Sequence, residues 1–220
     1  NVTGTLRLGS TAAYAGVGHI TFVSSANAYG LRSGPTALAE SDATTDAPKH
    51  FYLHHKYLCE LAMRSFADVD GDTIYAIARP CMVVGPNMSN SALSTLATKV
   101  LFYPHPDHSS YQFIDVEDVA DALTQIVSSR VGGTLNLAPD DSMTVREIAA
   151  TAGHRAIHVP LWLARKASDL GFALGLTPFS SRWVTLGDPV MRPERSRAVL
   201  GWTASRSSRD ALCGSAIVPT

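Results

Sequence analysis

Two short apolar runs, each preceded by a helical pattern, constrain the fold more than any other feature of the sequence. The runs cover residues 19–25 and 73–78, and neither alternates regularly between apolar and polar residues. Strands that are buried on both faces of a parallel sheet have this pattern. Helical patterns at residues 3–15 and 50–66 complete the order helix, strand, helix, strand. That order predicts βαβ units and a doubly wound, parallel α/β sheet.

Beyond residue 80 the predicted elements are shorter and of mixed type. In chain order we predict a helix at 91–101, an extended segment at 111–114, a helix at 116–128, a strand at 134–137, and helices at 144–152, 161–174 and 193–200. Thr144 and Glu147 have the spacing of a capping box at the start of one of these helices. A smaller mixed α/β lobe is therefore expected beside the parallel sheet.

The composition indicates an ordinary soluble globular protein and excludes several kinds of partner. Hydrophobic residues make up 45% of the 220 residues and charged residues 17%, which excludes a disordered chain. The formal net charge of −1 gives no reason to expect nucleic acid. No segment reaches the roughly 20 apolar residues that span a bilayer, so we expect no membrane partner.

The cysteine and histidine residues predict neither a disulfide framework nor a metal site. The three cysteines are odd in number and form no C-x-x-C pair, which is typical of reduced thiols in a cytoplasmic protein. Cys81 is expected to be a buried packing residue, since no base is visible near it. His105 and His108 lie in a predicted loop without a third placed ligand, so we expect no metal.

Tyr52 and Lys56 form the first candidate for chemistry. They stand four residues apart in a predicted helix and so lie on one face of it. A free tyrosine, with a pKa of about 10, is a poor base at neutral pH, but a nearby ammonium group lowers that pKa. Such a tyrosine can move a proton to or from a substrate hydroxyl.

Ser25 is the second candidate, because it stands at the carboxyl end of a predicted parallel strand, where open α/β sheets bind ligands. Each candidate has a simpler interpretation. Tyr52 and Lys56 alone would suit the exposed edge of an amphipathic helix, and Ser24 and Ser25 could merely cap a turn.

Together, these residues resemble the extended short-chain dehydrogenase/reductases, the NAD-dependent epimerase/dehydratase family. The matching segments follow the order of the family along nearly the whole chain. They are Asn1-Val2-Thr3-Gly4-Thr5, the strand and Ser-Ser-x-x-x-Tyr-Gly ending at 22–30, the Y-x-x-x-K pair Tyr52 and Lys56, Arg79-Pro80 followed by Gly85-Pro86, the segment 113–120, Asn136, and the Leu-Gly-Trp segment within 195–202.

The resemblance implies a role for each of several residues. Tyr52 would be the general acid/base, Ser25 would orient the substrate oxygen, and Lys56 would bind the nicotinamide ribose and depress the pKa of Tyr52. The implied cofactor is NAD or NADP, held by Tyr52, Lys56, Pro80 and Val83. The implied substrate-binding residues are Ser25, Ala26, Met82 and Tyr111. A homodimer, built through a four-helix bundle that includes the Tyr-Lys helix, is also implied.

The resemblance also implies a division of the chain. Residues 1–80 would form the C-terminal half of a dinucleotide-binding Rossmann domain. Residues 81–220 would form a substrate-binding lobe interleaved with the last Rossmann elements.

The sequence departs from the family in its phosphate-binding turn. Gly16 and Gly18 follow a predicted helix and precede a strand, which is the wrong order for a phosphate loop and suits a helix C-cap. We therefore expect a glycine-rich N-terminal piece to be missing and the chain alone to be inactive.

A second departure concerns the substrate. Met82 and Tyr111 stand where nucleotide-sugar members of the family often carry Asn and Arg. A diphosphate favours charge-assisted donors, so a less polar alcohol or carbonyl is as plausible a substrate as a sugar nucleotide. The alternative to an enzyme is a non-catalytic dinucleotide-binding sensor or assembly protein on the same fold. The intact set of Ser25, Tyr52 and Lys56 favours an epimerase, dehydratase or reductase.

Overall fold

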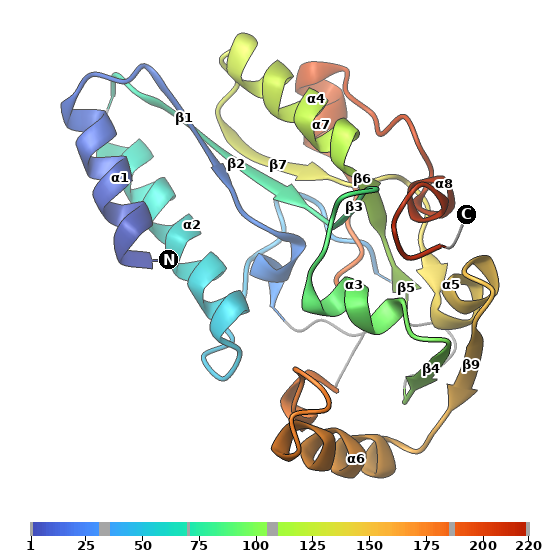
Figure 1. The fold of residues 1–220 in the computed structure, drawn as a ribbon. Coiled ribbons are helices and arrows are strands. Elements are labelled where there is room, and N and C mark those ends of the chain that lie inside the picture. The colour runs from blue at the N-terminus through green and yellow to red at the C-terminus, as the bar shows by residue number, and fades with distance from the viewer. Residues whose placement is uncertain (1, 31–35, 70, 105–109, 185–187, 219–220) are drawn as a thin grey trace.

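The central element is a parallel sheet of three strands. The computed structural model describes residues 2–30, 36–69, 71–104, 110–184 and 188–218. Within these ranges the sheet has the order β1-β2-β7, formed by β1 (His19–Val23), β2 (Ile74–Pro80) and β7 (Gly133–Leu137) (Figure 1). β2 lies in the middle and is almost entirely buried, as the apolar run that ends at Ala78 predicts.

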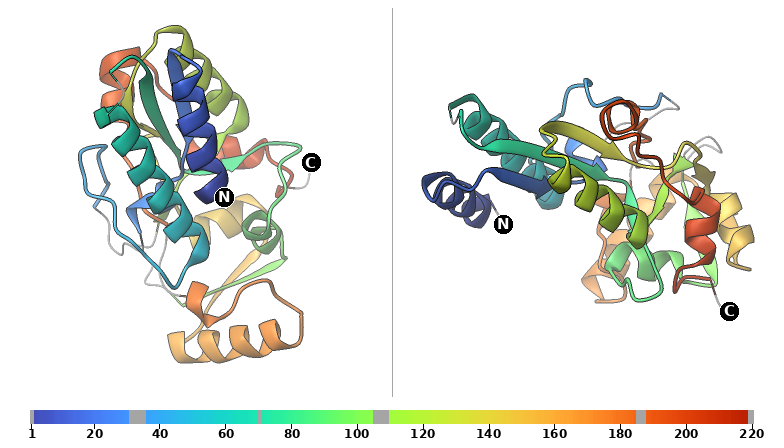
Figure 2. Two further views of the ribbon diagram at one scale, coloured as in Figure 1. Left: turned by 90° about the vertical axis from the view of Figure 1, so that its left-hand side faces the viewer. Right: turned by 90° about the horizontal axis from the view of Figure 1, so that it is seen from above.

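Helices cover both faces of this sheet. α2 (Phe51–Val69) packs on one face with α1 (Val2–Tyr14) beside it, and α4 (Val116–Ser128) packs on the other (Figure 2). Side chains alternate along β2, so that Tyr75 and Ile77 meet Met63 of α2, whereas Ala76 and Ala78 join the core that contains Ala122 of α4. The predicted Rossmann-like, doubly wound α/β fold is confirmed.

The chain leaves the sheet at Cys81 and enters a second, smaller lobe. The strand pairs of this lobe are β3 (Met82–Val84) with β6 (Phe113–Asp115), β4 (Val100–Tyr103) with β9 (Arg155–His158), and β5 (Ser110–Tyr111) with β8 (Met143–Thr144). Its helices are α3 (Ser91–Leu96), α5 (Val145–Thr151), α6 (Leu161–Ala173) and α8 (Ser208–Cys213). Phe113, Met143, Ile148 and Leu212 lie in its separate core.

Three shorter elements connect these parts. The 3-10 helix η1 (Ala26–Tyr29) follows β1, and a second one, η2 (Ser181–Trp183), packs on α6. α7 (Glu194–Leu200) packs against β7 at the far edge of the sheet. Within the described ranges, no helix combines the length and apolar character that crossing a membrane requires.

One predicted element is wrong at its C-terminal end. The helix expected at 91–101 ends at Leu96, and Val100 begins strand β4 instead. The run Val100–Tyr103 pairs with β9, a partner more than fifty residues away, and this pairing overrides the local helical pattern. The capping box at Thr144 and Glu147 is confirmed, since both of its hydrogen bonds are present.

Candidate active site

Ser25 is the second residue after β1 and is buried. Its Oγ accepts a hydrogen bond of 3.2 Å from the backbone N–H of Asn27 and so caps η1. The capping role that the sequence allowed is therefore present. That bond uses a lone pair of the oxygen, so the hydroxyl hydrogen can still be donated to a ligand.

Tyr52 and Lys56 lie in the first two turns of α2. Tyr52 is 37% exposed, and the Lys56 Nζ lies 5.8 Å from the centre of its ring. The same Nζ donates a 2.8 Å hydrogen bond to the carbonyl of Val23, the last residue of β1. The ammonium group is therefore held between the tyrosine and the strand end that leads to Ser25. Burial lowers the pKa of Lys56, and Coulombic interactions with Cys59 and Glu60 oppose that effect.

The residues predicted to contact the nicotinamide lie at the neighbouring strand end. Pro80 is the buried last residue of β2, and Val83 follows in β3. Ala26, predicted to contact substrate, shares one core cluster with Cys81 and Val83. The carboxyl ends of β1 and β2 are adjacent because Val23 pairs with Ala78.

Met82 and Tyr111, the other predicted substrate contacts, lie farther into the lobe. Both are partly buried, and they belong to β3 and β5 respectively. Burial raises the pKa of Tyr111, and the nearby charge of Asp188 raises it further. Burial also raises the pKa of Asp188 itself, to about 6.

A buried ion pair behind the strand ends was not predicted from the sequence. Glu60 and Arg79 are 1% and 0% exposed, and two hydrogen bonds of 2.8 and 2.5 Å join them. Burial raises the pKa of Glu60, but the hydrogen bonds and charge of Arg79 outweigh it and leave that pKa lowered. Ser24 donates a further 2.7 Å bond to Glu60. The signal available in the sequence was the position of Glu60, one helical turn beyond Lys56.

The lobe touches α2 directly before Tyr52. The ring of Trp183 in η2 lies 5.2 Å from that of His50 and 6.2 Å from that of Phe51. The backbone carbonyl of Arg182 lies 2.9 Å from the Nε2 of His50. The segment that leads into the predicted acid/base is therefore fixed against the lobe.

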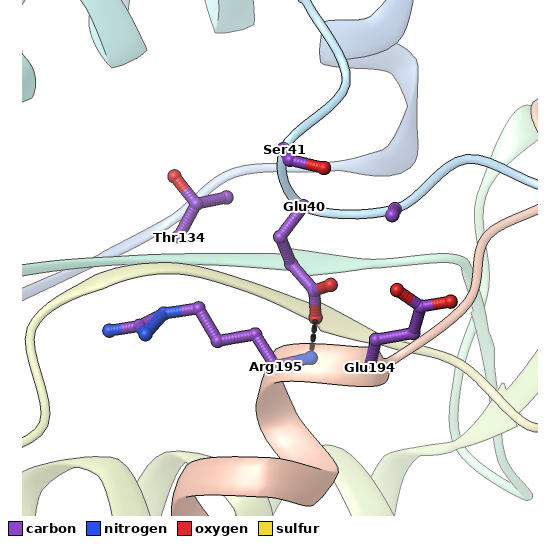
Figure 3. A pocket seen from close by; sticks show the side chains of 6 residues that line it. Glu40, Ser41, Thr134, Glu194 and Arg195 are labelled. Carbon is purple, nitrogen blue, oxygen red and sulfur yellow. Dashed lines mark hydrogen bonds between the residues drawn. The ribbon is translucent and has the colours of Figure 1, made fainter.

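A separate pocket of about 360 Å³ lies beside β7 and the start of α7. It is lined by Ala39, Glu40, Ser41, Thr134, Glu194 and Arg195, five of which are labelled in Figure 3. The Glu40 Oε1 accepts hydrogen bonds from the backbone N–H groups of Arg195 and Asn136, both at 3.1 Å. None of the predicted catalytic, cofactor or substrate residues lines this pocket.

The histidines weighed as metal ligands, His105 and His108, lie outside the described residues. Among the residues that are described, no three His, Cys, Asp or Glu side chains are grouped as metal ligands would be. Cys59 and Cys81 are free and buried, and Cys213 is free and exposed.

The donors present suit the nicotinamide end of a dinucleotide. An ammonium group has three N–H donors, and the bond to Val23 uses one of them. Lys56 and the hydroxyl of Tyr52 thus offer donors of the kind that ribose hydroxyls accept. The phosphate end has no counterpart among the described residues, since β1, β2 and β7 are followed by η1, β3 and Ala138-Pro139 rather than by a glycine-rich turn and a helix.

The fold and the strand-end residues together define a Rossmann-like protein of the dinucleotide-binding class. The model of the "NAD dependent epimerase/dehydratase family" matches residues 1–138, and the chain belongs to that family. The predicted family is confirmed, and NAD is the cofactor that the description of the family names. No curated protein matches the chain.

Solved structures with similar folds share little sequence with this chain. MoeE5 in complex with UDP-glucuronic acid and NAD is 23% identical with a TM-score of 0.73, and the match covers 98% of this chain and 69% of that one. UDP-glucose 4-epimerase of Thermus thermophilus, complexed with NAD, is 20% identical with a TM-score of 0.72, and the match covers 96% of this chain and 67% of that one. RMD from Pseudomonas aeruginosa, complexed with NADPH, is 18% identical with a TM-score of 0.70, and the match covers 99% of this chain and 71% of that one. At these identities the likeness shows the fold alone.

Proposed function

We propose that this chain carries the catalytic group of an NAD- or NADP-dependent enzyme that acts on a secondary alcohol or carbonyl. The observation that carries the proposal is the position of Lys56, whose ammonium group lies between the ring of Tyr52 and the end of β1. Membership of the family supports the same class of reaction.

Tyr52, Ser25 and Lys56 have separate roles in the proposed reaction. Tyr52 moves the proton to or from the substrate oxygen as general acid/base, and its partial exposure leaves it open to a ligand. Ser25 donates its hydroxyl hydrogen to the same oxygen, since its lone pair is engaged by Asn27. Lys56 stabilises the phenolate form of Tyr52 and holds ribose hydroxyls. The nicotinamide, when bound beside Pro80 and Val83, supplies the hydride acceptor or donor.

For the substrate, we favour the less polar alcohol or carbonyl over a sugar nucleotide. Met82 and Tyr111 offer no cationic donor to a diphosphate. Asp188 adds a carboxyl group close enough to Tyr111 to raise the pKa of that tyrosine, and an ionised carboxylate there repels an anionic ligand.

The exposed Leu8 of α1 and Leu61 of α2 offer apolar surface for the homodimer that the resemblance implies.

The test of the proposed function is Tyr52→Phe in the full-length gene product. Loss of the phenolic proton should lower kcat about 10²–10⁴-fold, whereas NAD affinity loses at most one hydrogen bond to the ribose and should fall far less. Turnover is followed by absorbance of the reduced nicotinamide with secondary alcohols and UDP-glucose, and affinity by calorimetry.

Tyr57→Phe is the matched control, because Tyr57 lies on the same helix outside the proposed group and should retain full turnover. A fall in NAD affinity as large as the fall in kcat would make Tyr52 a structural residue. NAD binding without turnover of any substrate would support the non-catalytic alternative.

A further inference from the structure

The carboxylate of Glu60 is the best-connected buried group near the proposed active site. Its Oε1 accepts hydrogen bonds from Ser24 Oγ at 2.7 Å and Arg79 Nε at 2.8 Å. Its Oε2 accepts from an Arg79 guanidinium nitrogen at 2.5 Å and an Arg64 nitrogen at 3.2 Å. The side chain is 1% exposed, so these partners replace water for both of its oxygens.

These partners lie next to the residues of the proposed site. Ser24 directly precedes Ser25, and Arg79 directly precedes Pro80. Lys56 and Glu60, one turn apart on α2, bond to the consecutive residues Val23 and Ser24 at the end of β1. Glu60 therefore joins the helix that carries Tyr52 to both strand ends that carry the other predicted groups.

Stability alone does not account for such a group. Removing two charges from water costs about as much as their attraction returns, and well-packed apolar residues often replace a buried ion pair without loss. Unlike apolar residues, the ion pair fixes the relative orientation of the segments that it joins, because each hydrogen bond holds an atom of one segment against an atom of another.

The charge of Glu60 also acts on Lys56. Burial lowers the pKa of Lys56, and Coulombic interactions with Cys59 and Glu60 oppose that fall. Further charged or titratable groups near this pair, among the described residues, are Tyr52 and Arg64 on α2, Arg79 on β2, and Tyr29 on η1. The ring of Tyr29 lies 4.4 Å from the Arg79 guanidinium carbon.

We propose that Glu60, held by Arg79, is a positioning residue of this active site, which aligns Ser25 with the Tyr52–Lys56 pair. The inference rests on the proposed function for its effect on turnover. Its effect on Lys56 is independent of any substrate.

The test replaces the whole ion pair rather than half of it. Glu60→Gln alone leaves Arg79 buried without a counter-charge and is expected to unfold readily. In the double variant Glu60→Met, Arg79→Met the core stays filled, and circular dichroism should show a folded protein. The Lys56 pKa, measured by NMR on lysines methylated with carbon-13, should fall below that of the native protein. The kcat should fall about 10²-fold with little change in KM, as expected of a misaligned catalytic group.

Ser24→Ala tests the link between Glu60 and β1 alone, because it removes the hydrogen bond from Ser24 to Glu60 and leaves the ion pair with Arg79 in place. It should lower kcat without moving the Lys56 pKa. Arg197→Gln is the control, since it breaks the exposed ion pair with Asp140 away from the site and should change neither measurement.

A folded double variant with native kcat and a native Lys56 pKa would overturn the proposal. If the full-length gene product turns over no substrate, the proposed function fails, and the Lys56 titration still decides whether Glu60 acts on that group.

Discussion

At the scale of single residues, the carboxyl group of Asp188 has an unusually high pKa. Burial raises the pKa of its carboxyl from 3.8 to about 6. The folded protein therefore keeps a proton that the unfolded chain releases between about pH 4 and pH 6, and this group makes folding less favourable as the pH rises through that window. A shift of this size corresponds to about 3 kcal/mol once the pH exceeds both values.

Asp188→Asn should therefore stabilise the protein at about pH 8 and have little effect at about pH 4. Urea unfolding of the native protein and the variant at both pH values gives the difference. Asp140→Asn, at an exposed side chain that bonds Arg197, controls for the general loss of a negative charge. A gain from Asp188→Asn that is equal at both pH values would show that the ionised carboxylate is not the cause.

The sequence identifies some residues of the candidate site and misses others for a physical reason. Tyr52 and Lys56 can be found because their relation is local, four residues along one helix. Glu60 has the same spacing from Lys56, but its role depends on Ser24 and Arg79, 36 and 19 residues away. Asp188 lies in a stretch without regular structure, where no periodicity indicates what a side chain meets. Burial of a charge is a property of tertiary contacts, which a single sequence does not reveal.

At the scale of elements, the contact between α1 and α2 depends on a glycine. Gly9 is the buried residue of α1, and a Cβ added there would lie 2.7 Å from the ring of Phe66 and 3.1 Å from the methyl carbon of Met63. Nothing lies within 4 Å of the corresponding position at Gly4, in the same helix. Substitutions at the two glycines therefore separate the effect of helix propensity on stability from the effect of packing.

Gly4→Ala should stabilise the chain by about 0.5–1 kcal/mol, because alanine favours the helix and meets no neighbour. Gly9→Ala gains the same propensity but forces Phe66 and Met63 to move, at a cost of about 1–3 kcal/mol. Gly9→Ala should therefore be the less stable variant by about that cost in thermal or urea unfolding. Equal effects of the two substitutions would mean that α1 does not pack on α2 as closely as described.

Elements with a clear local pattern, which include the three strands of the sheet, were predicted well, whereas several short strands of the lobe were not. α4 begins and ends at the expected residues 116 and 128, because its apolar stripe is regular and Asp115 caps it. The four-residue strands β4 and β9 were missed, since they exist through the pairing of Val100 with Arg155 and of the residues that follow. β3 was missed for the same reason, because its partner β6 lies thirty residues farther along the chain.

At the scale of the whole molecule, the parallel sheet and the lobe meet where β2 passes through Cys81 into β3. The predicted catalytic residues lie at the ends of β1 and in α2, and the predicted substrate residues Met82 and Tyr111 lie across this junction (Figure 1). Ligands of open α/β sheets bind at the carboxyl ends of the strands, so we propose that substrate binds between the two parts.

The same arrangement predicts how the 220-residue chain alone should interact with NAD. In dinucleotide-binding folds the pyrophosphate rests on backbone N–H groups at a helix N-terminus behind a glycine turn. The three strands of the sheet lead instead into η1, β3 and Ala138-Pro139. Lys56 and Tyr52 can bind ribose hydroxyls, but a few neutral and ammonium hydrogen bonds in a partly open site give little affinity.

We therefore expect calorimetric titration of NAD and NADP into the folded chain to give dissociation constants weaker than about 100 μM. A family member with a glycine-rich turn serves as the positive control under the same conditions. Micromolar binding by this chain would place its phosphate site on a segment other than the ends of these strands.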